Sequence, residues 1–218
     1  MPIESIKNKT QRMLDILSIL KKDYPDAKCS LNYNSPFQLL VATILSAQCT
    51  DERVNRVTKK LFKKYPEPKD YINLTVSEIG KEIFSTGFYN NKAKSIKGLV
   101  LMLRDEFNEI IPGKIEQLVK LPGVGRKTAN VVLGNIFDVP GIVVDTHVTR
   151  IMNLLGFTKS RNAVIIEREL EKIIDNNDWV LFTHLIIDHG RAICVANRPN
   201  CMKCSINDLC PSSKALNI

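Results

Sequence analysis

Apolar residues recur at the 3.6-residue spacing of an α-helix along almost the whole chain, and no convincing pair of strands interrupts them. Ser35 and Pro36 mark one helix start, with a capping hydroxyl followed by proline at the first helical position. A second helix is expected to be capped by Asp51 and to end before Pro66. Further helices are expected at about 77–84, 91–107, 114–120, 126–137, 146–155, 162–174 and 178–191, which with one near the N-terminus makes about ten. The pattern predicts an all-α fold.

Length and charge narrow the possible functions. The 218 residues can form one large core or two small ones, and Pro140 and Gly141 offer the best boundary between two. Lys and Arg number 31 against 23 Asp and Glu, a net charge of +8 that favours a polyanionic partner, with nucleic acid ahead of a membrane surface. No run approaches the roughly 18 consecutive apolar residues of a membrane span. We therefore expect a soluble, intracellular protein.

The stretch LPGVGRKTANVVLGNIF, residues 121–137, ends one helical pattern and starts another. Pro122 is expected to stop the first helix, and Gly123 and Gly125 permit backbone conformations closed to other residues. The resulting tight hairpin would let a ligand approach backbone N–H groups at the positive end of the second helix. These groups suit a phosphate of a polynucleotide backbone. A structural hairpin with a solvated basic end explains the stretch equally well.

Spacing excludes two other phosphate-binding motifs for this stretch. The Walker A motif needs glycine directly before the lysine, where Arg126 stands, and the dinucleotide fingerprint needs a third glycine where Thr128 stands. Lys127 falls opposite the apolar stripe of its helix, so its amine should point out of the core. The helix N-terminus and Arg126 both disfavour a protonated amine there, which makes Lys127 a candidate nucleophile.

The stretch GIVVDTHVTRIMNLLG, residues 141–156, supplies a possible partner for that lysine. Asp145 precedes an apolar helical pattern, so we expect it to cap the helix. A carboxylate held at a helix start keeps its charge, which suits stabilising a cationic transition state or assisting a proton transfer. Thr146 and His147 follow it, and packing or capping alone would explain either residue.

Four cysteines near the C-terminus are the most specific signal in the chain. Cys194, Cys201, Cys204 and Cys210 read C-x6-C-x2-C-x5-C, whereas Cys29 and Cys49 stand alone. Both tetrahedral zinc and a cubane iron-sulfur cluster accept four cysteines. A single C-x2-C pair with longer outer gaps and a proline after the last cysteine favours [4Fe-4S].

The cysteine segment is also basic. Arg191, Arg198, Lys203 and Lys214 outnumber the single Asp208. The cluster could therefore brace a loop that binds phosphate. A redox or electron-transfer role is the rival interpretation.

Taken together, these motifs closely resemble the endonuclease III branch of the helix-hairpin-helix DNA glycosylases. The resemblance runs through LLVATILSAQCTDERVN, GFYNNKAKSI, LPGVGRKTANVVLG, VDTHVTR and the four cysteines, in that order and over nearly the whole chain. It implies a bifunctional glycosylase and lyase that removes oxidised pyrimidines from duplex DNA. It further implies a six-helix barrel domain at 29–139, with the helix-hairpin-helix at about 114–137. The iron-sulfur domain would comprise 1–28 and 140–218, with the cluster loop at 194–210.

The resemblance also implies roles for individual residues. Lys127 and Asp145 would be catalytic, and the four cysteines would hold a [4Fe-4S] cluster. Gln48 and Phe88 would fill the space left by a flipped base, although the family more often has leucine where Phe88 stands. Asp51 would approach the lesion, unless it only caps its helix. The remaining expected DNA contacts are Gly123, Gly125, Arg126, Thr128, His147, Arg198 and Lys203.

Three other interpretations of the sequence stay open. A monofunctional mismatch or adenine glycosylase of the same superfamily would release the base without a lyase step, but those branches generally lack a lysine at position 127. A non-enzymatic DNA-binding protein would have no reason to combine Asp145 with Lys127. An iron-sulfur electron carrier would need the cluster but not the hairpin. We expect a monomer that binds duplex DNA with oxidised pyrimidines or abasic sites and does not bind a membrane. If the source is bacterial, we expect the protein in the cytoplasm, associated with the nucleoid.

Overall fold

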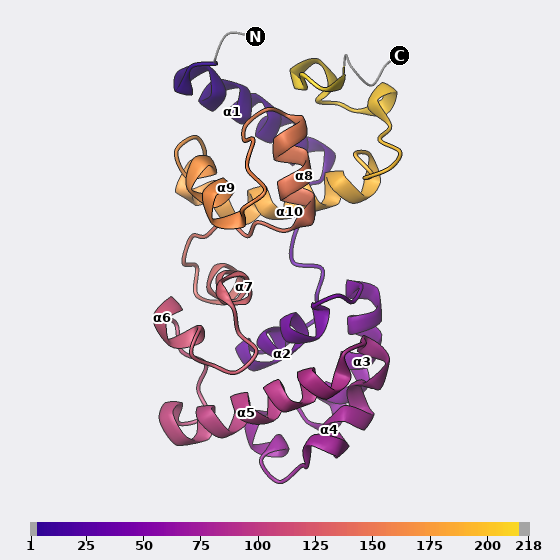
Figure 1. Cartoon of the computed structure of the whole chain (residues 1–218), viewed down its shortest axis with the longest axis vertical. Helices are drawn as coiled ribbons and strands as arrows, with labels where there is room; N and C mark the ends of the chain where they lie inside the picture. The colour runs from indigo at the N-terminus through magenta and orange to yellow at the C-terminus, as the bar shows by residue number, and fades with distance from the viewer. Residues whose placement is uncertain (1–3, 214–218) are drawn as a thin grey trace. The chain divides into compact units, whose positions relative to one another are not determined.

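The computed structural model describes residues 4–213, and this part of the chain contains α-helices and short 3-10 helices but no strand (Figure 1). The expectation of an all-α fold is confirmed. The chain divides into two compact units. One runs from Cys29 to Val139, and the other combines the described residues up to Lys28 with those from Pro140 onward. Their assignment as a barrel domain and a cluster domain stays a prediction.

The unit Cys29–Val139 is built around one buried helix. Its elements are α2 (Pro36–Ser46), α3 (Asp51–Lys64), η1 (Pro68–Tyr71), α4 (Val76–Ile83), η2 (Phe84–Thr86), α5 (Tyr89–Phe107), α6 (Ile115–Leu118) and α7 (Arg126–Ile136). Residues Phe37–Val41 of α2 are all buried, so the helix presents apolar or buried side chains in every direction. Helices α3, α5 and α7 pack around it. A helix that is apolar all round must lie in the core, which explains its central place.

Helix starts in this unit follow local capping rules. The Ser35 hydroxyl accepts a hydrogen bond from the Gln38 N–H at 3.2 Å, with Pro36 at the first helical position, as expected. The second prediction is wrong by one residue, because Thr50 and not Asp51 caps α3. Asp51 instead occupies the first turn, where a negative charge is favourable near the helix N-terminus.

The other unit packs four longer helices against one another. It contains α1 (Ile6–Asp23), α8 (Thr146–Leu154), α9 (Ala163–Leu170), η3 (Asn176–Asp178), α10 (Trp179–Ala192), η4 (Cys201–Lys203) and η5 (Asn207–Leu209). α10 contacts both α1 and α8. Gly190 allows the approach to α8, because a Cβ atom there would lie 2.7 Å from His147 Nδ1. Within residues 4–213, we find no helix with the length and apolar character to cross a membrane.

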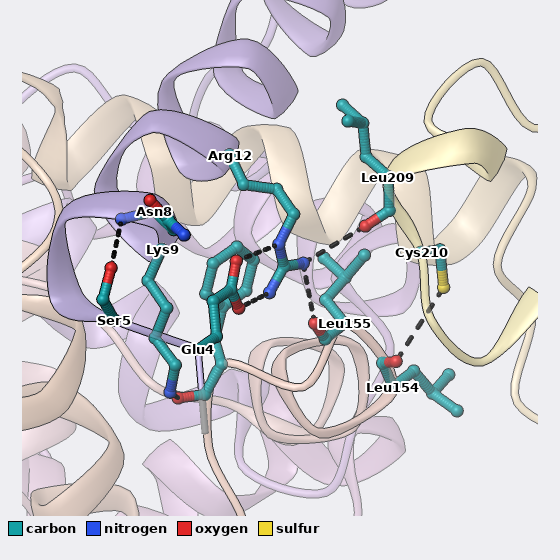
Figure 2. A network of polar contacts seen from close by, with 10 residues as sticks. Glu4, Ser5, Asn8, Lys9, Arg12, Leu154, Leu155, Leu209 and Cys210 are labelled. Atoms are coloured by element: carbon teal, nitrogen blue, oxygen red, sulfur yellow. Dashed lines mark hydrogen bonds and ion pairs between the residues drawn. The ribbon is translucent and has the colours of Figure 1, made fainter. Parts of the chain in front are cut away.

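Arg12 of α1 ties the N-terminal helix to the segment that carries the cysteines (Figure 2). Its guanidinium donates to the carbonyl oxygens of Leu155 at 2.8 Å and Leu209 at 3.1 Å. It also forms a two-point ion pair with the Glu4 carboxylate and lies 4.1 Å from the centre of the Phe157 ring. Chain segments far apart in the sequence therefore meet at one planar cation, a geometry to which arginine is well suited.

Candidate functional site

The glycine hairpin between α6 and α7 differs in detail from the expectation. α6 ends at Leu118, earlier than predicted, because the N–H groups of Lys120 and Leu121 bond in tight turns to carbonyls three residues back. Pro122 therefore follows the helix end and does not cause it. Gly123 adopts φ +80°, which favours glycine, whereas Gly125 has φ −90°, which any residue accepts.

The two glycines also differ in their surroundings. A Cβ atom on Gly123 would lie 2.7 Å from the Ser95 Cβ, whereas one on Gly125 would meet nothing within 4 Å. The fold thus requires glycine at 123 and leaves open space at 125. That space lies beside the first turn of α7, where no side chain caps the helix.

Lys127 is the second residue of α7 and is exposed, as its position opposite the apolar stripe predicts. Arg126 is also exposed, and Thr128 is half-buried. Two cationic side chains and the backbone N–H groups of one helix start therefore occur together at the hairpin. This arrangement can bind an anion and offers a primary amine beside it.

Two exposed side chains of the same unit stand on left-handed turns. Gln48 has φ 53° and Phe88 has φ 48°, and Phe88 is 64% exposed. Gln48 lies eleven residues after Phe37, a spacing that fits one helical stripe, but α2 ends at Ser46 and the backbone leaves the helix at Ala47, where ψ is 114°. A left-handed conformation costs a non-glycine residue about 1–2 kcal/mol. Neither side chain offsets that cost by burial in the core, because both are exposed.

A buried lysine that sequence reasoning missed lies between these turns. Lys92 of α5 is 5% exposed and donates to the carbonyl oxygens of Leu45 and Thr86 at 2.8 and 2.9 Å. Burial lowers the pKa of this lysine. Its sequence context, GFYNNKAKSI, belongs to the family motif but gives no sign that one of its two lysines is enclosed.

In the other unit, Asp145 caps α8 as predicted. Its carboxylate accepts a hydrogen bond from the Val148 N–H at 2.8 Å, and the residue is half-buried. His147 follows in the first turn, with its Nδ1 3.2 Å from a guanidinium nitrogen of Arg150. Another nitrogen of Arg150 donates to the Cys194 carbonyl oxygen at 2.6 Å. Arg150 stands in the VDTHVTR motif, yet sequence reasoning gave it no role.

The four C-terminal cysteines all line one pocket. Its other walls include Ile151, Leu154, Leu155, Ile193 and Ile206. Burial raises the pKa of Cys204 to about 11 and also raises that of Cys194. Thiolate ligands in such a pocket need the positive charge of a metal. Within residues 4–213, no three His, Cys, Asp or Glu side chains are placed to hold a single metal ion. Four thiols around one apolar pocket nevertheless form a suitable donor set for an iron-sulfur cluster.

The remaining expected site residues lie at the surface or outside the described chain. Arg198 and Lys203 are exposed in the loop between the cysteines. Asp51 is half-buried in the first turn of α3. Lys214 lies outside the described residues. Lys127 belongs to the unit Cys29–Val139 and Asp145 to the other unit, so their pairing stays a prediction from the resemblance.

Comparisons with known proteins place the chain in a family. Residues 41–176 match the model of the "HhH-GPD superfamily base excision DNA repair protein" family. A relative named endonuclease III, from Synechocystis sp., is 50% identical over 98% of both chains. Two solved structures are 45% identical and cover 95% of this chain, a non-covalent endonuclease III–DNA complex and a trapped endonuclease III–DNA covalent intermediate. Their TM-scores are 0.91 and 0.90, with 97% and 98% of those chains covered. The chain therefore belongs to the HhH-GPD superfamily of base excision DNA repair proteins and, within it, to the endonuclease III family.

Proposed function

We propose that this chain is a base excision repair enzyme, a bifunctional DNA glycosylase and AP lyase that excises oxidised pyrimidines from duplex DNA. The observation that carries the proposal is the exposed amine of Lys127 at the uncapped start of α7. A covalent enzyme–DNA intermediate needs a nucleophile of this kind. One 45% identical structure is a trapped covalent intermediate between endonuclease III and DNA.

Binding begins with the phosphates of duplex DNA. The net charge of +8 attracts the polyanion from a distance. The N–H groups at the start of α7 would then donate hydrogen bonds to a phosphate, because Gly125 leaves its backbone open to close approach. Gly123, Arg126 and Thr128 would support this contact. His147, Arg198 and Lys203 would contact DNA from the other unit.

Base release requires the damaged nucleotide to leave the helical stack, at a cost of about a few kcal/mol. Gln48 and Phe88 would fill the space left behind, and Asp51 would approach the lesion. The Lys127 amine then attacks C1′ of the deoxyribose while the glycosidic bond breaks and the base takes the electron pair and a proton. The Asp145 carboxylate stabilises positive charge on the sugar or removes the proton from the lysine.

The lyase step follows from the same covalent bond. The nitrogen lone pair then forms a double bond to C1′ and breaks the bond from C1′ to the ring oxygen O4′, which takes a proton. The ring opens, and the nitrogen keeps one hydrogen in an iminium between Lys127 and C1′ that acidifies the hydrogens at C2′. Removal of one C2′ proton forms a C1′–C2′–C3′ conjugated system and breaks the bond from C3′ to its phosphate oxygen. The strand is nicked, and water then hydrolyses the imine to free the lysine.

We also assign a [4Fe-4S] cluster to Cys194, Cys201, Cys204 and Cys210. The support is the common pocket that the four thiols line and the apolar side chains that surround it. A bound cluster would supply structural rigidity to the loop that carries Arg198 and Lys203. Iron and sulfide content of the purified protein tests this assignment. Cys204→Ala should lose both, whereas Cys29→Ala, which changes a cysteine of the other unit, should retain them.

Borohydride trapping tests the catalytic assignment. Purified protein is incubated with a duplex carrying one thymine glycol, and separately with an abasic-site duplex, in the presence of the reductant. Wild-type protein should form a covalent adduct that Lys127→Ala cannot form. Lys120→Ala removes another exposed lysine of the same hairpin and should trap like the wild type.

Each alternative predicts a different result from this experiment. Base release without trapping or nicking would identify a monofunctional glycosylase. Binding of both duplexes with no reaction would identify a DNA-binding protein. Trapping by Lys127→Ala at the wild-type rate would show that another nucleophile acts.

A further inference from the structure

The ammonium group of Lys92 joins two turns that are far apart in the sequence. Its nitrogen donates at 2.8 Å to the carbonyl oxygen of Leu45 and at 2.9 Å to that of Thr86. The residue is 5% exposed, so the group is enclosed and cannot serve as a nucleophile or a phosphate ligand. A buried ammonium is costly unless it is hydrogen-bonded, and the two carbonyls supply those bonds.

The Leu45 carbonyl belongs to the last turn of α2, where a helix leaves four carbonyls without helical partners. Local groups bond three of them: the Ser46 hydroxyl to Thr43, and the N–H groups of Ala47 and Cys49 to Ile44 and Ser46. Lys92 donates to the fourth. A positive charge is also favourable at a helix C-terminus. Lys92 thus bonds the remaining carbonyl oxygen at the end of α2, that of Leu45, which lies three residues before Gln48.

The other contact is equally close to Phe88. Thr86 ends η2, and only Gly87 separates it from Phe88. The backbone N–H of Lys92 itself donates to the Phe88 carbonyl oxygen at 3.2 Å. Lys92 therefore contacts the Phe88 turn through its side chain and its backbone, and the Gln48 turn through its side chain.

We propose that Lys92 is a positioning residue that holds the turn of Gln48 and the turn of Phe88 at a fixed separation. The inference rests on the proposed function, in which these two side chains together fill the space left by a flipped nucleotide. They can do so only if their separation matches that space, and small misplacements in such sites reduce rates strongly. The hydrogen bonds of one ammonium group set that separation without contact to DNA.

The test compares one lesion in two settings by single-turnover base excision. In the first, a thymine glycol lies in a fully paired duplex. In the second, it lies opposite a one-nucleotide gap, so that it has no pairing partner and leaves the stack at lower cost. Lys92→Met, which keeps the length but removes the donors, should slow excision from the paired duplex about tenfold or more relative to the gapped one.

Lys97→Met is the matched control. Lys97 lies five residues later on α5 and also donates to two backbone carbonyls, those of Tyr71 and Ile72, at 3.4 and 2.5 Å. Its contacts lie at the last residue of η1 and the residue that follows, and not at the turns of Gln48 and Phe88. Lys97→Met should leave the ratio of the excision rates on the paired and the gapped duplex unchanged. Lys92→Gln retains N–H donors with a shorter reach, and it serves if the methionine variant does not fold.

A double-mutant cycle separates positioning from stability. If Lys92 acts through the two turns, Lys92→Met should change the paired-to-gapped ratio less than about twofold in a Gln48→Ala, Phe88→Ala background. Equal slowing on both substrates, an unchanged ratio, or the same change in both backgrounds would overturn the inference. A wild-type protein inactive on both substrates would instead overturn the proposed function.

Discussion

Gly123→Ala should lower the stability of the folded chain, because the α6–α7 hairpin has neither the backbone conformation nor the space for a Cβ atom at this position. The left-handed φ of +80° costs alanine about 1–2 kcal/mol. The added Cβ would also lie 2.7 Å from the Cβ of Ser95, an atom fixed to the backbone of α5 that cannot rotate away. Overpacking of this kind costs about 1–3 kcal/mol. A combined loss of about 3 kcal/mol lowers the Tm of a chain of this size by roughly 6–12 °C.

Gly125→Ala is the control for this prediction, because φ is −90° and the new Cβ meets nothing within 4 Å. Thermal unfolding should leave its Tm within about 2 °C of the wild type. Its affinity for abasic duplex DNA, measured by fluorescence anisotropy at one salt concentration, should nevertheless fall, because the Cβ occupies the space proposed for a phosphate. Equal Tm values for Gly123→Ala and wild type would refute the steric reasoning. Unchanged affinity of Gly125→Ala would refute the proposed contact.

Three further predictions concern single side chains. Asp145→Asn keeps the cap on the Val148 N–H, so stability measured by urea unfolding should change by less than about 0.5 kcal/mol, while base excision should slow by about 100-fold or more. Phe88→Gly relieves a left-handed side chain and should raise stability by about 1 kcal/mol, while excision from paired duplex slows; a loss of stability would contradict this. The hydrogen bond from Arg12 lowers the pKa of Glu4 below 4.5, so the pair stabilises the folded chain above that pH and less as the pH falls through the lowered value. The difference in unfolding free energy between wild type and Glu4→Gln should therefore be present at neutral pH and vanish in strong acid.

Local signals allowed much of the helical framework to be predicted. α7 begins at Arg126 and α8 follows Asp145, as spacing and capping chemistry indicate. The four cysteines were identified by spacing alone, and the structure places them around one pocket. Each of these features depends on residues near one another in the chain, which is where propensity and capping act.

Features that depend on distant contacts could not be predicted. Lys92 meets Leu45, which is 47 residues away, and Arg12 meets Leu155, which is 143 residues away. Lysine and arginine side chains are rarely buried, so the residue type alone predicts that both side chains are exposed. Only the completed fold shows that carbonyl oxygens at helix and turn ends require them. The turn at Gln48 could not be predicted for a related reason, because an apolar stripe gives no sign of where the backbone leaves the helix.

The turns of Gln48 and Phe88 combine backbone strain with exposed side chains. Both residues are exposed and hold a φ near +50°, where glycine would cost less. Their side chains contribute little to the core, so the stability of the folded chain gives no reason for glutamine or phenylalanine at these positions. A buried lysine between the turns donates a hydrogen bond to a carbonyl oxygen beside each of them. Strain that neighbouring structure maintains at exposed positions is expected where side chains must meet a partner. The gap in DNA that we propose these two side chains fill is such a partner.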